Sequence, residues 1–491
     1  MNRQRGTRKK KRGLGKTVLV WSCLLLLPLL LAVLALEQVN RTPRELAPYI
    51  ERRAAGHNPV IVGIGAWAGK ILRALDRMEP VSHPLPTLSA GVQPAYRAIS
   101  GSASGREVEA GTVEQALLAI RNAQPGDDIV LLPGVYRFSG NNIIVSNPGQ
   151  SSARITVKAR QAGTVKLELS SQQGFIVSAP YWTFENLHLR GVCATHTDCE
   201  HAFHVTGEAR HFVARNNTIL DFNAHFKINS HNGQHPDDGL IEQNTLSNSA
   251  IRDTRNPVTV IDVVGASRWR IRRNLISDFI KGGSDRISYG AFTKGAGGEN
   301  VIEQNIVICE HRLHGAAGQR VGLSLGGGGT GPQFCRDQRC ITEQDRSVID
   351  SNLVMSCSDD GIYLNKAAAS RVSNNTLLDT GGIEVRYAES SADVTANLVD
   401  GKIRAKEGGL MHASDNLDTS MTSLYLGRHP VRARFRNPAK LDLSWNNKPD
   451  ELPRGLPVPT DLCGTQRSAQ SPAGAFDDFA GCLGHAAPAK P

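Results

Sequence analysis

The sequence predicts an all-β fold: a right-handed, single-stranded parallel β-helix, in which the chain winds into a solenoid. The main observation is a recurring phrase of Ile or Val, two mostly polar residues, Asn, a spacer and an aliphatic residue. Repeats of ~20–30 residues are typical of solenoids. An Asn at one place in every copy predicts a ladder of hydrogen bonds between stacked turns. The copies are Ile241–Asn244, Ile271–Asn274, Ile302–Asn305, Ile349–Asn352, Val372–Asn375 and Val394–Asn397, with looser ones at Asn186 and Asn217.

Length and composition agree with this fold. A chain of 491 residues is long for one compact core, but each repeat of a solenoid contacts only its neighbours, so the number of repeats has no such limit. The 48 glycines and the aromatic content of 5% suit many short strands joined by tight turns.

The basic charge of the chain is concentrated at its N-terminus. Residues 1–16 contain eight Lys and Arg and no acid, and removing those eight charges from the net charge of +10 leaves +2. The excess therefore indicates membrane topology and argues against a nucleic-acid partner. The apolar run Val18–Leu36 that follows is just long enough to cross a bilayer.

We accordingly predict a cytoplasmic basic segment at residues 1–16 and a transmembrane signal anchor at residues 17–37, which would contact the lipid bilayer. The predicted location is the bacterial inner membrane, crossed once, with the C-terminal body in the periplasm. The alternative is a cleaved signal peptide and a secreted protein.

The cysteines favour an oxidising compartment. Eight of the nine lie in the predicted exported part, and an even number in an exported chain favours disulfides. Three pairs are close in sequence, and Cys309 and Cys357 follow the Asn of their repeats by similar offsets, so that stacked coils would bring them together. The predicted pairs are Cys193 with Cys199, Cys335 with Cys340, Cys309 with Cys357, and Cys463 with Cys482.

The rest of the chain divides by pattern. Residues 38–104 are predicted to form a juxtamembrane helical region followed by a linker rich in Pro, Ser and Gly. The β-helix is predicted at residues 105–420. It opens with an amphipathic helix from Thr112 that covers the first coil, because an open strand edge promotes aggregation. Residues 421–491 are predicted to be a C-terminal cap and tail.

The segment Val113–Tyr136 (VEQALLAIRNAQPGDDIVLLPGVY) resembles the opening of right-handed parallel β-helix proteins of the chondroitinase B and alginate lyase type, polysaccharide lyase family six. The resemblance extends over about residues 105–420. It implies the fold more strongly than the activity, since lyases and non-enzymes share this scaffold. The same resemblance implies an acidic polysaccharide as the partner.

One strand of each coil can be aligned with the next by hand, and alternate residues then point outward. The inward positions of this alignment are almost all apolar. The outward ones form a polar and aromatic strip, in which Asp262 is expected beside Lys294. The predicted substrate-binding residues of this strip are Asn229, Asp262, Phe292, Tyr363, Asn365 and Arg386.

Lys294 is the predicted catalytic base. Lyases of acidic polysaccharides remove a proton next to a carboxylate, which requires a base and neutralisation of the carboxylate. The resemblance implies a catalytic Lys in this strand. It also implies an Arg one coil later, where this chain has Gly326. The candidate substitutes are Arg320, His311, His314 and Arg386, of which we name Arg320 as the predicted catalytic residue. The alternative without a function is that Lys294 belongs to an ion pair on the surface, which would stabilise the fold little.

No cofactor or metal site is predicted. The resemblance implies calcium, but Ile287 and Tyr289 stand where its acidic ligands are expected. The predicted function is a membrane-anchored exported β-helix protein that acts on or binds polysaccharide, most concretely a uronate-specific lyase using Lys294. The alternative is a non-catalytic carbohydrate-binding or cell-envelope scaffold protein.

Overall fold

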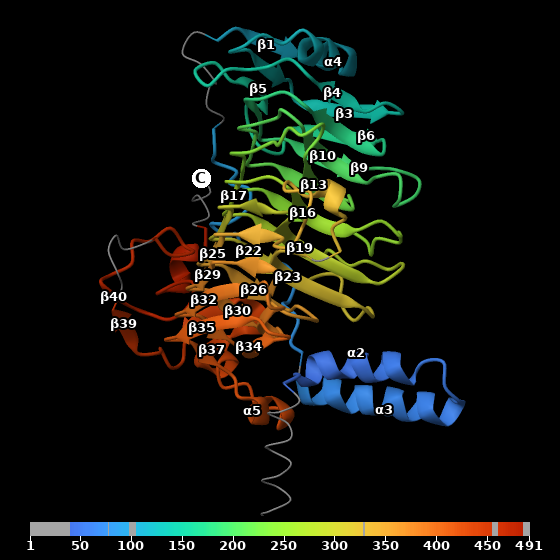
Figure 1. The fold of residues 1–491 in the computed structure, drawn as a ribbon. Helices are drawn as coiled ribbons and strands as arrows, with labels where there is room; N and C mark the ends of the chain where they lie inside the picture. The colour runs from blue at the N-terminus through green and yellow to red at the C-terminus, as the bar shows by residue number, and fades with distance from the viewer. Residues whose placement is uncertain (1–39, 77, 98–104, 328, 454–459, 485–491) are drawn as a thin grey trace, which may run out of the picture.

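The computed structural model describes residues 40–76, 78–97, 105–327, 329–453 and 460–484. Three long parallel sheets run side by side along one axis (Figure 1), and the chain visits them in turn once per coil. This confirms the predicted parallel β-helix. We call the 12-stranded sheet A, the 10-stranded sheet B and the 11-stranded sheet C.

Most strands have three to six residues, and within each sheet every strand pairs in parallel with the strands of the coils before and after it. Sheet A consists of β1 (Glu107–Ala110), β2 (Asp128–Leu131), β5 (Ile155–Ala159), β8 (Trp182–Glu185), β11 (Val213–Arg215), β14 (Leu240–Glu242), β17 (Arg270–Arg272), β21 (Val301–Glu303), β25 (Val348–Asp350), β29 (Ser370–Ser373), β32 (Ser391–Thr395) and β35 (Leu410–Ser414). Sheet B consists of β4 (Ile143–Val145), β7 (Gln173–Val177), β10 (His201–Thr206), β13 (Ala224–Asn229), β16 (Val258–Val264), β19 (Ile287–Lys294), β23 (Gln319–Leu325), β27 (Ile362–Asn365), β31 (Gly382–Arg386) and β34 (Lys402–Lys406). Sheet C consists of β3 (Gly134–Ser139), β6 (Val165–Ser170), β9 (His188–Gly191), β12 (Thr218–Leu220), β15 (Thr245–Ser247), β18 (Leu275–Ser277), β22 (Ile306–Ile308), β26 (Leu353–Met355), β30 (Thr376–Leu378), β33 (Leu398–Val399) and β36 (Leu417–Asp418).

The Asn of the repeated phrase forms a continuous ladder at the turn from sheet A to sheet C. Each side-chain oxygen accepts the backbone N–H and the side-chain N–H of the Asn one coil earlier, at 2.8–3.0 Å. The residue before each Asn has a positive φ, of about 55°, which bends the chain out of one sheet into the next. The predicted ladder is therefore confirmed. Its members are Asn217, Asn244, Asn274, Asn305, Asn352, Asn375, Asn397 and Asn416.

Helix α4 (Val113–Arg121) covers the first coil, as predicted. The Thr112 hydroxyl accepts the Gln115 N–H at its N-terminus, and Ala116 and Ile120 are buried against the strands. The helix thereby closes the open end of the apolar interior, which would otherwise face water.

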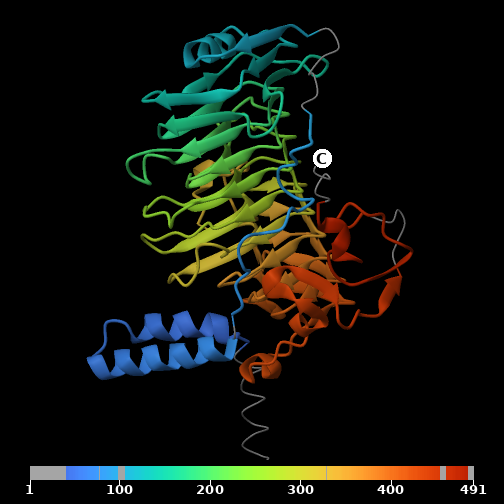
Figure 2. The same ribbon diagram turned by 180° about the vertical axis from the view of Figure 1, so that it is seen from behind.

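The segment predicted as a linker is packed along the body. Residues 78–97 run from the C-terminal coils towards the N-terminal ones (Figure 2), and Val81, Leu88 and Ala90 are buried against the C-terminal cap. Gln93 bonds through its backbone to Asn216. The segment packs because the chain must return from its N-terminal hairpin to the first coil, and the cap offers apolar surface on the way.

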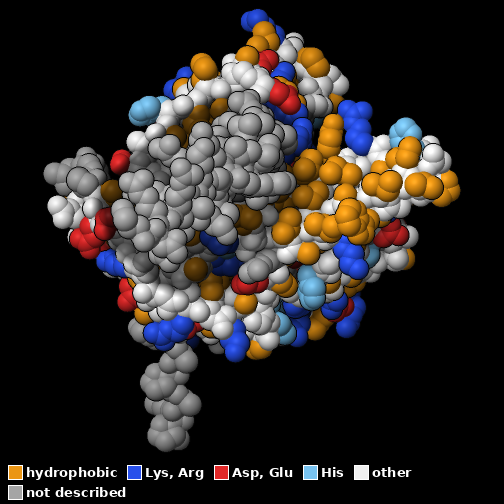
Figure 3. All heavy atoms as spheres, turned by 90° about the horizontal axis from the view of Figure 1, so that it is seen from below, with side chains coloured by type: hydrophobic (Ala, Val, Ile, Leu, Met, Phe, Trp, Pro, Cys, Tyr) orange, Lys and Arg blue, Asp and Glu red, His pale blue; other side chains and the backbone are white. Residues whose placement is uncertain are grey.

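The N-terminal helices α2 (Pro43–Ala54) and α3 (Pro59–Asp76) form a hairpin at the C-terminal end of the β-helix. It protrudes from the body and carries many hydrophobic side chains, as the view from below shows (Figure 3). Within the part of the chain that the structure describes, no helix combines the length and the apolarity needed to cross a bilayer. The predicted basic segment at residues 1–16 and anchor at residues 17–37 lie outside the described residues.

All four predicted disulfides are present. Cys309 and Cys357 join successive coils, with their Cα atoms 4.8 Å apart, in keeping with their similar offsets of four and five residues from Asn305 and Asn352 of the ladder. Cys463 and Cys482 hold the C-terminal cap, where helix α5 (Met421–Tyr425) and the pairs β37 (Phe435–Asn437) with β38 (Asp442–Trp445) and β39 (Glu451–Pro453) with β40 (Gln470–Pro472) lie.

The ladder predicts a specific loss of stability. Replacement of Asn305 by Ala leaves the buried backbone N–H of Asn274 without its acceptor and removes the side-chain hydrogen bonds to Asn274 and Asn352. We expect a loss of about 2–4 kcal/mol in the free energy of unfolding, because each buried unsatisfied polar group costs about 1–3 kcal/mol. Urea denaturation measures it. The exposed Asn141→Ala is the matched control, and equal stability of the two variants would contradict a structural role for the ladder.

Candidate functional site

The principal pocket lies on the outer face of sheet B and has a volume of about 600 Å³. Strands β10, β13, β16 and β19 form its floor, the turn at residues 230–235 one side, and the loop at residues 329–338 the other. Its chemical character comes from one Arg, two Lys and three His. These are Arg336, Lys227, Lys294, His201, His204 and His235.

Lys294 is the last residue of β19, and its side chain is partly buried. Its Nζ lies 4.5 Å from the centroid of the Phe292 ring and has no hydrogen bond or ion pair with any described residue. Burial lowers the pKa of Lys294, the charge of Asp262 opposes that shift, and the charge of Lys227 adds to it. Lys294 is therefore a primary amine with a lowered pKa that is free to meet a ligand. Phe292, predicted to bind substrate, is buried and supports Lys294.

Asp262 does not lie directly beside Lys294, which corrects the predicted register. In the pairing of β16 with β19, Asp262 stands opposite Phe292, and Val264 stands opposite Lys294. The carboxylate of Asp262 pairs instead with Lys227 of the preceding coil, with Nζ and Oδ2 2.8 Å apart. The error is a shift of two residues, which leaves every side chain on its own face, so the apolar inward pattern does not reveal it.

Three histidines add polar, uncharged groups to the pocket: His201 and His204 of β10, and His235 of the turn at residues 230–235. Burial lowers the pKa of His201, His204 and His235, so these imidazoles are neutral at pH 7. His204 Nε2 lies 2.5 Å from Asn229 Oδ1, which places the predicted ligand Asn229 in the pocket beside it. The Gln173 amide lies 2.6 Å from the other ring nitrogen of His204.

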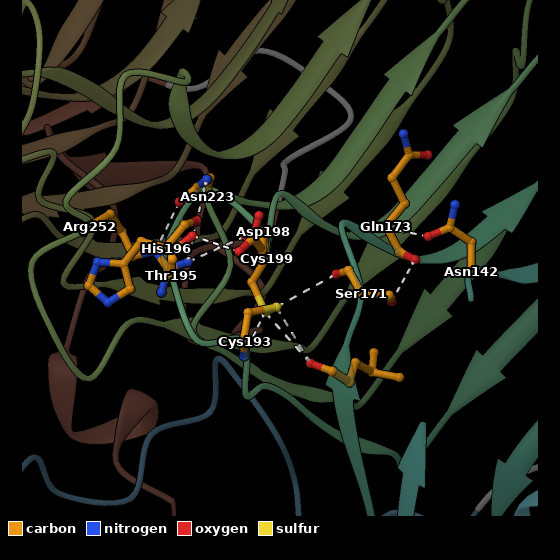
Figure 4. Close-up of a disulfide and its surroundings, with 11 residues drawn as sticks. Asn142, Ser171, Gln173, Cys193, Thr195, His196, Asp198, Cys199, Asn223 and Arg252 are labelled. Atoms are coloured by element: carbon orange, nitrogen blue, oxygen red, sulfur yellow. Dashed lines mark hydrogen bonds between the residues drawn. A yellow bond between two sulfur atoms is a disulfide. The ribbon is translucent and has the colours of Figure 1, made fainter. Parts of the chain in front are cut away.

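The Cys193–Cys199 disulfide holds the chain just before β10 (Figure 4). It closes a short loop whose His196 carbonyl accepts bonds from Asn223 and Arg252. The Arg252 guanidinium also donates to the Cys199 carbonyl. The start of β10, with His201 and His204, is thus positioned by a covalent bond and a buried arginine.

Gly326 and Gly327 have a steric role in this site. A Cβ on Gly326, which has a φ of 73°, would lie 1.8 Å from the Asn365 carbonyl oxygen, and one on Gly327 would lie 2.9 Å from Lys294 Cδ. The backbone contact excludes a larger residue at Gly326, and the Lys294 side chain occupies the space beside Gly327. The following loop, closed by the Cys335–Cys340 disulfide, brings the exposed Phe334 ring and Arg336 to the pocket.

A second pocket of about 380 Å³ lies further along sheet B, between its last strands and α2. It contains three of the predicted ligands, Tyr363, Asn365 and Arg386, which lie together: Arg386 and Asn365 donate to the Tyr363 hydroxyl at 3.3 and 3.1 Å. The oxygen Oδ1 of Asn365 is buried and has no hydrogen-bond partner among the described residues. Burial, and then the charge of Glu384, raise the pKa of Asp359 in this pocket to about 6.

Arg320, predicted as a catalytic residue, lies outside both pockets. Its guanidinium is buried and pairs with Glu310, with Nε and Oε1 2.8 Å apart, and it also donates to the carbonyls of Ala316 and Ala317. These contacts engage all three nitrogens. The structure thus removes Arg320 from the candidate site, and its spacing from Lys294 in the sequence gave no sign of the buried partner.

The residues present do not suit calcium. Ile287 and Tyr289, which stand at the positions implied by the family resemblance, offer no carboxylate and line the second pocket. Among the residues that the structure describes, one group of acids has the spacing of metal ligands: Glu45, Asp360 and Glu384. The Arg404 guanidinium already pairs with all three, so the cation for this cluster is part of the protein.

Lys227, His204 and Arg336 are the site residues that sequence analysis missed. Lys227 stands in the outward column next to Asn229, and extending the alignment one coil earlier would have reached His204. Arg336 lies in an irregular loop without a repeating pattern, so no sequence signal identifies it.

Comparisons with known proteins agree with this architecture. Residues 110–414, more than half of the chain, match the family described as Chondroitinase B. No curated protein matches the sequence. Among solved structures, an alginate lyase from Paenibacillus sp. str. FPU-7 is 14% identical, over 63% of this chain and 99% of its own, with a TM-score of 0.36. The pectate lyase Pel9A is 15% identical, over 77% of this chain and 98% of its own, with a TM-score of 0.48.

A third similar structure is the PL6 family polysaccharide lyase Pedsa3628 from Pseudopedobacter saltans. It is 14% identical, over 70% of this chain and 97% of its own, with a TM-score of 0.32. The family match spans the β-helix from its first strand to its last coils and includes the coil of Lys294. The chain belongs to the chondroitinase B family.

Proposed function

We propose that the protein is a lyase of acidic polysaccharides, specific for uronate residues, with Lys294 as the catalytic base. The observation that carries this proposal is the state of the Lys294 amine: it has no charged partner among the described residues, and it faces a pocket. Burial lowers its pKa towards the working range of a base. The family resemblance implies a catalytic Lys at the same position.

The atoms and electrons of the proposed elimination balance with protein groups and water. The neutral Lys294 amine takes the proton next to the uronate carboxylate, and the electron pair left on carbon forms a double bond to the neighbouring carbon. The glycosidic C–O bond breaks, and the leaving oxygen receives a proton from the new ammonium or from water. Lys227, held by Asp262, is the cation placed to stabilise the charge that develops on the carboxylate.

The two pockets on sheet B suit a polymer. From Asn229 on β13 to Arg386 on β31 the strip crosses five inter-strand steps, roughly 24 Å at about 4.8 Å each. Polar groups, the exposed Phe334 ring and the tyrosines of the second pocket line this path. We assign the first pocket to the reacting sugar and Tyr363, Asn365 and Arg386 to a neighbouring sugar of the same chain.

The site is proposed to work outside the cytoplasm, in a protein anchored to the bacterial inner membrane through residues 17–37 with its body in the periplasm. The four disulfides support an oxidising compartment. The basic residues before the apolar run support retention of that end in the cytoplasm.

The second candidate is a carbohydrate-binding or cell-envelope scaffold protein without catalysis. Two observations favour it: Gly326 stands where the family resemblance implies an Arg, and Ile287 and Tyr289 replace the implied acids. Both pockets would then bind glycan, and Lys294 would pair with a carboxylate of the ligand.

The lyase proposal is tested by incubating the full chain with alginate, chondroitin, dermatan and pectate and following the ultraviolet absorbance of unsaturated uronate ends. We expect product from at least one polymer and a loss of about 10²–10⁴-fold in rate for Lys294→Ala, because a positioned general base contributes that much. The exposed Lys440→Ala is the matched control. Absence of product with all four polymers, together with retained binding on a glycan array, would favour the scaffold protein.

The dependence of the rate on pH provides a separate prediction. The active form of Lys294 is the neutral amine, so kcat/KM should rise with pH through the pKa of Lys294. Asp262 raises that pKa and Lys227, which Asp262 neutralises, lowers it. Asp262→Asn should therefore move the rising limb to lower pH, whereas the exposed Asp393→Asn should not. If the rising part of the pH profile of Asp262→Asn stays in place or moves to higher pH, Lys294 is excluded as the titrating base.

A further inference from the structure

We propose that the α2–α3 hairpin seats the protein on a lipid bilayer, through an apolar stripe of α3 that no other described part of the chain covers. The stripe consists of Val60, Ile64, Trp67 and Ile71, whose exposed fractions are 70%, 59%, 65% and 40%. Their spacing of four, three and four residues places them on one face of the helix. Figure 3 shows hydrophobic side chains gathered on this protruding hairpin.

The opposite face of α3 forms the interior of the hairpin. A Cβ on Gly65 would lie 2.5 Å from Ala54 Cβ, and one on Gly69 would meet the Glu51 side chain. The two glycines therefore allow the helices to pack closely, and Leu72 is buried on the same face. Because this contact is already satisfied, the stripe is not needed for the hairpin's own stability.

The hairpin is fixed to the body. Arg44 of α2 is buried and forms ion pairs with Asp76 of α3 and Asp379 of the β-helix, at 2.7 and 2.5 Å. It also donates to the Cys357 carbonyl. Glu45 pairs with Arg404 and Lys406 of the C-terminal coils. The stripe thus keeps one orientation relative to the β-helix, as a docking surface requires.

The sequence before the hairpin identifies a bilayer as the occupant. The apolar run Val18–Leu36 is long enough to cross a membrane, and only five residues separate it from Thr42, the N-cap of α2. Five extended residues span at most roughly 18 Å. Asn40 and Arg41 bond to Ala405 and Tyr425 at the end of the β-helix. The first described residues therefore lie at the same end of the molecule as the stripe.

The side chains around the stripe suit the interface between lipid and water. Trp67 lies in its centre, and Trp is enriched at the level of the headgroups. Lys70 is exposed on α3, and Arg53 is exposed on α2, where cations favour anionic lipids. An apolar face with flanking cations is the pattern of a helix that lies in the membrane surface.

Such docking would orient the catalytic face. The C-terminal coils would face the membrane, and the axis of the β-helix would point away from it. Four inter-strand steps separate β34 from β19, so Lys294 would lie about 20 Å further from the bilayer than the last strand of sheet B. This orientation does not depend on the proposed activity.

The test uses the full chain in vesicles of phosphatidylcholine and phosphatidylglycerol that contain brominated lipid, which quenches tryptophan on contact. Trp21→Phe removes the tryptophan of the apolar run. Of the remaining tryptophans besides Trp67, Trp182 and Trp269 are fully buried in the β-helix, and Trp445 packs on Phe435 and Phe476 in the C-terminal cap, where it is present equally in the test and control variants. We expect bromolipid to quench the fluorescence of this variant. The double variant Trp21→Phe, Trp67→Phe is the matched control and should show no quenching, and equal quenching in both would overturn the proposal.

A second variant separates the bilayer from a second copy of the chain as the occupant. Ile64→Glu and Ile71→Glu in the Trp21→Phe chain should abolish quenching, with an unchanged thermal melt of the β-helix. Ile64→Cys with Cys23→Ser reports on self-association. Disulfide-linked dimers of that variant in vesicles, with Trp67 unquenched, would assign the stripe to a second copy and contradict membrane docking.

Discussion

The rest of the structure depends on the hydrogen bonds of the Asn ladder. Each Asn oxygen accepts two N–H groups of the coil before it, so the height and the register of every coil are set by its neighbour. Because the ladder lies at the turn between sheets A and C, it aligns short strands that would not stay in register alone. The strip on sheet B inherits this order, and Lys294 reaches its pocket only because the coils before and after it are stacked in this way.

The site differs from its surroundings in how completely its charges are paired. Near the second pocket, Arg404 pairs with Glu45, Asp360 and Glu384, and Lys406 adds to the same network. In the first pocket Lys227 pairs with Asp262. Lys294 is partly buried, and within the described part of the chain its amine contacts the Phe292 ring without a hydrogen bond or ion pair. Burial without a charged partner disfavours the ammonium form of Lys294 and so costs free energy. A lysine that is retained in such a place is a candidate for function.

The sequence predicted the solenoid and the Asn ladder because their pattern repeats, and the capping helix because its capping residues are local. It predicted three disulfides from cysteines close in the sequence and the fourth from similar offsets within the repeat. It located Lys294, Asn229, Tyr363, Asn365 and Arg386 on the outer face from the repeated pattern. The contact of Asp262 with Lys294 was wrong because β16 continues two residues past Asp262, to Val264, and a shift of two residues preserves the alternation of faces. Arg320 was misassigned because its partner Glu310 lies in an irregular segment that periodicity does not describe. Packing of residues 78–97 onto the cap likewise depends on contacts between segments far apart in the sequence.

The central claim is that Lys294 removes a proton from a uronate in the pocket on sheet B. Proton NMR of acidic oligosaccharides mixed with the full chain tests it most directly. We predict loss of the signal of the proton next to the carboxylate, together with a new vinyl signal, for the wild-type chain and not for Lys294→Ala. Spectra that remain unchanged for every acidic oligosaccharide that the chain binds would contradict the claim.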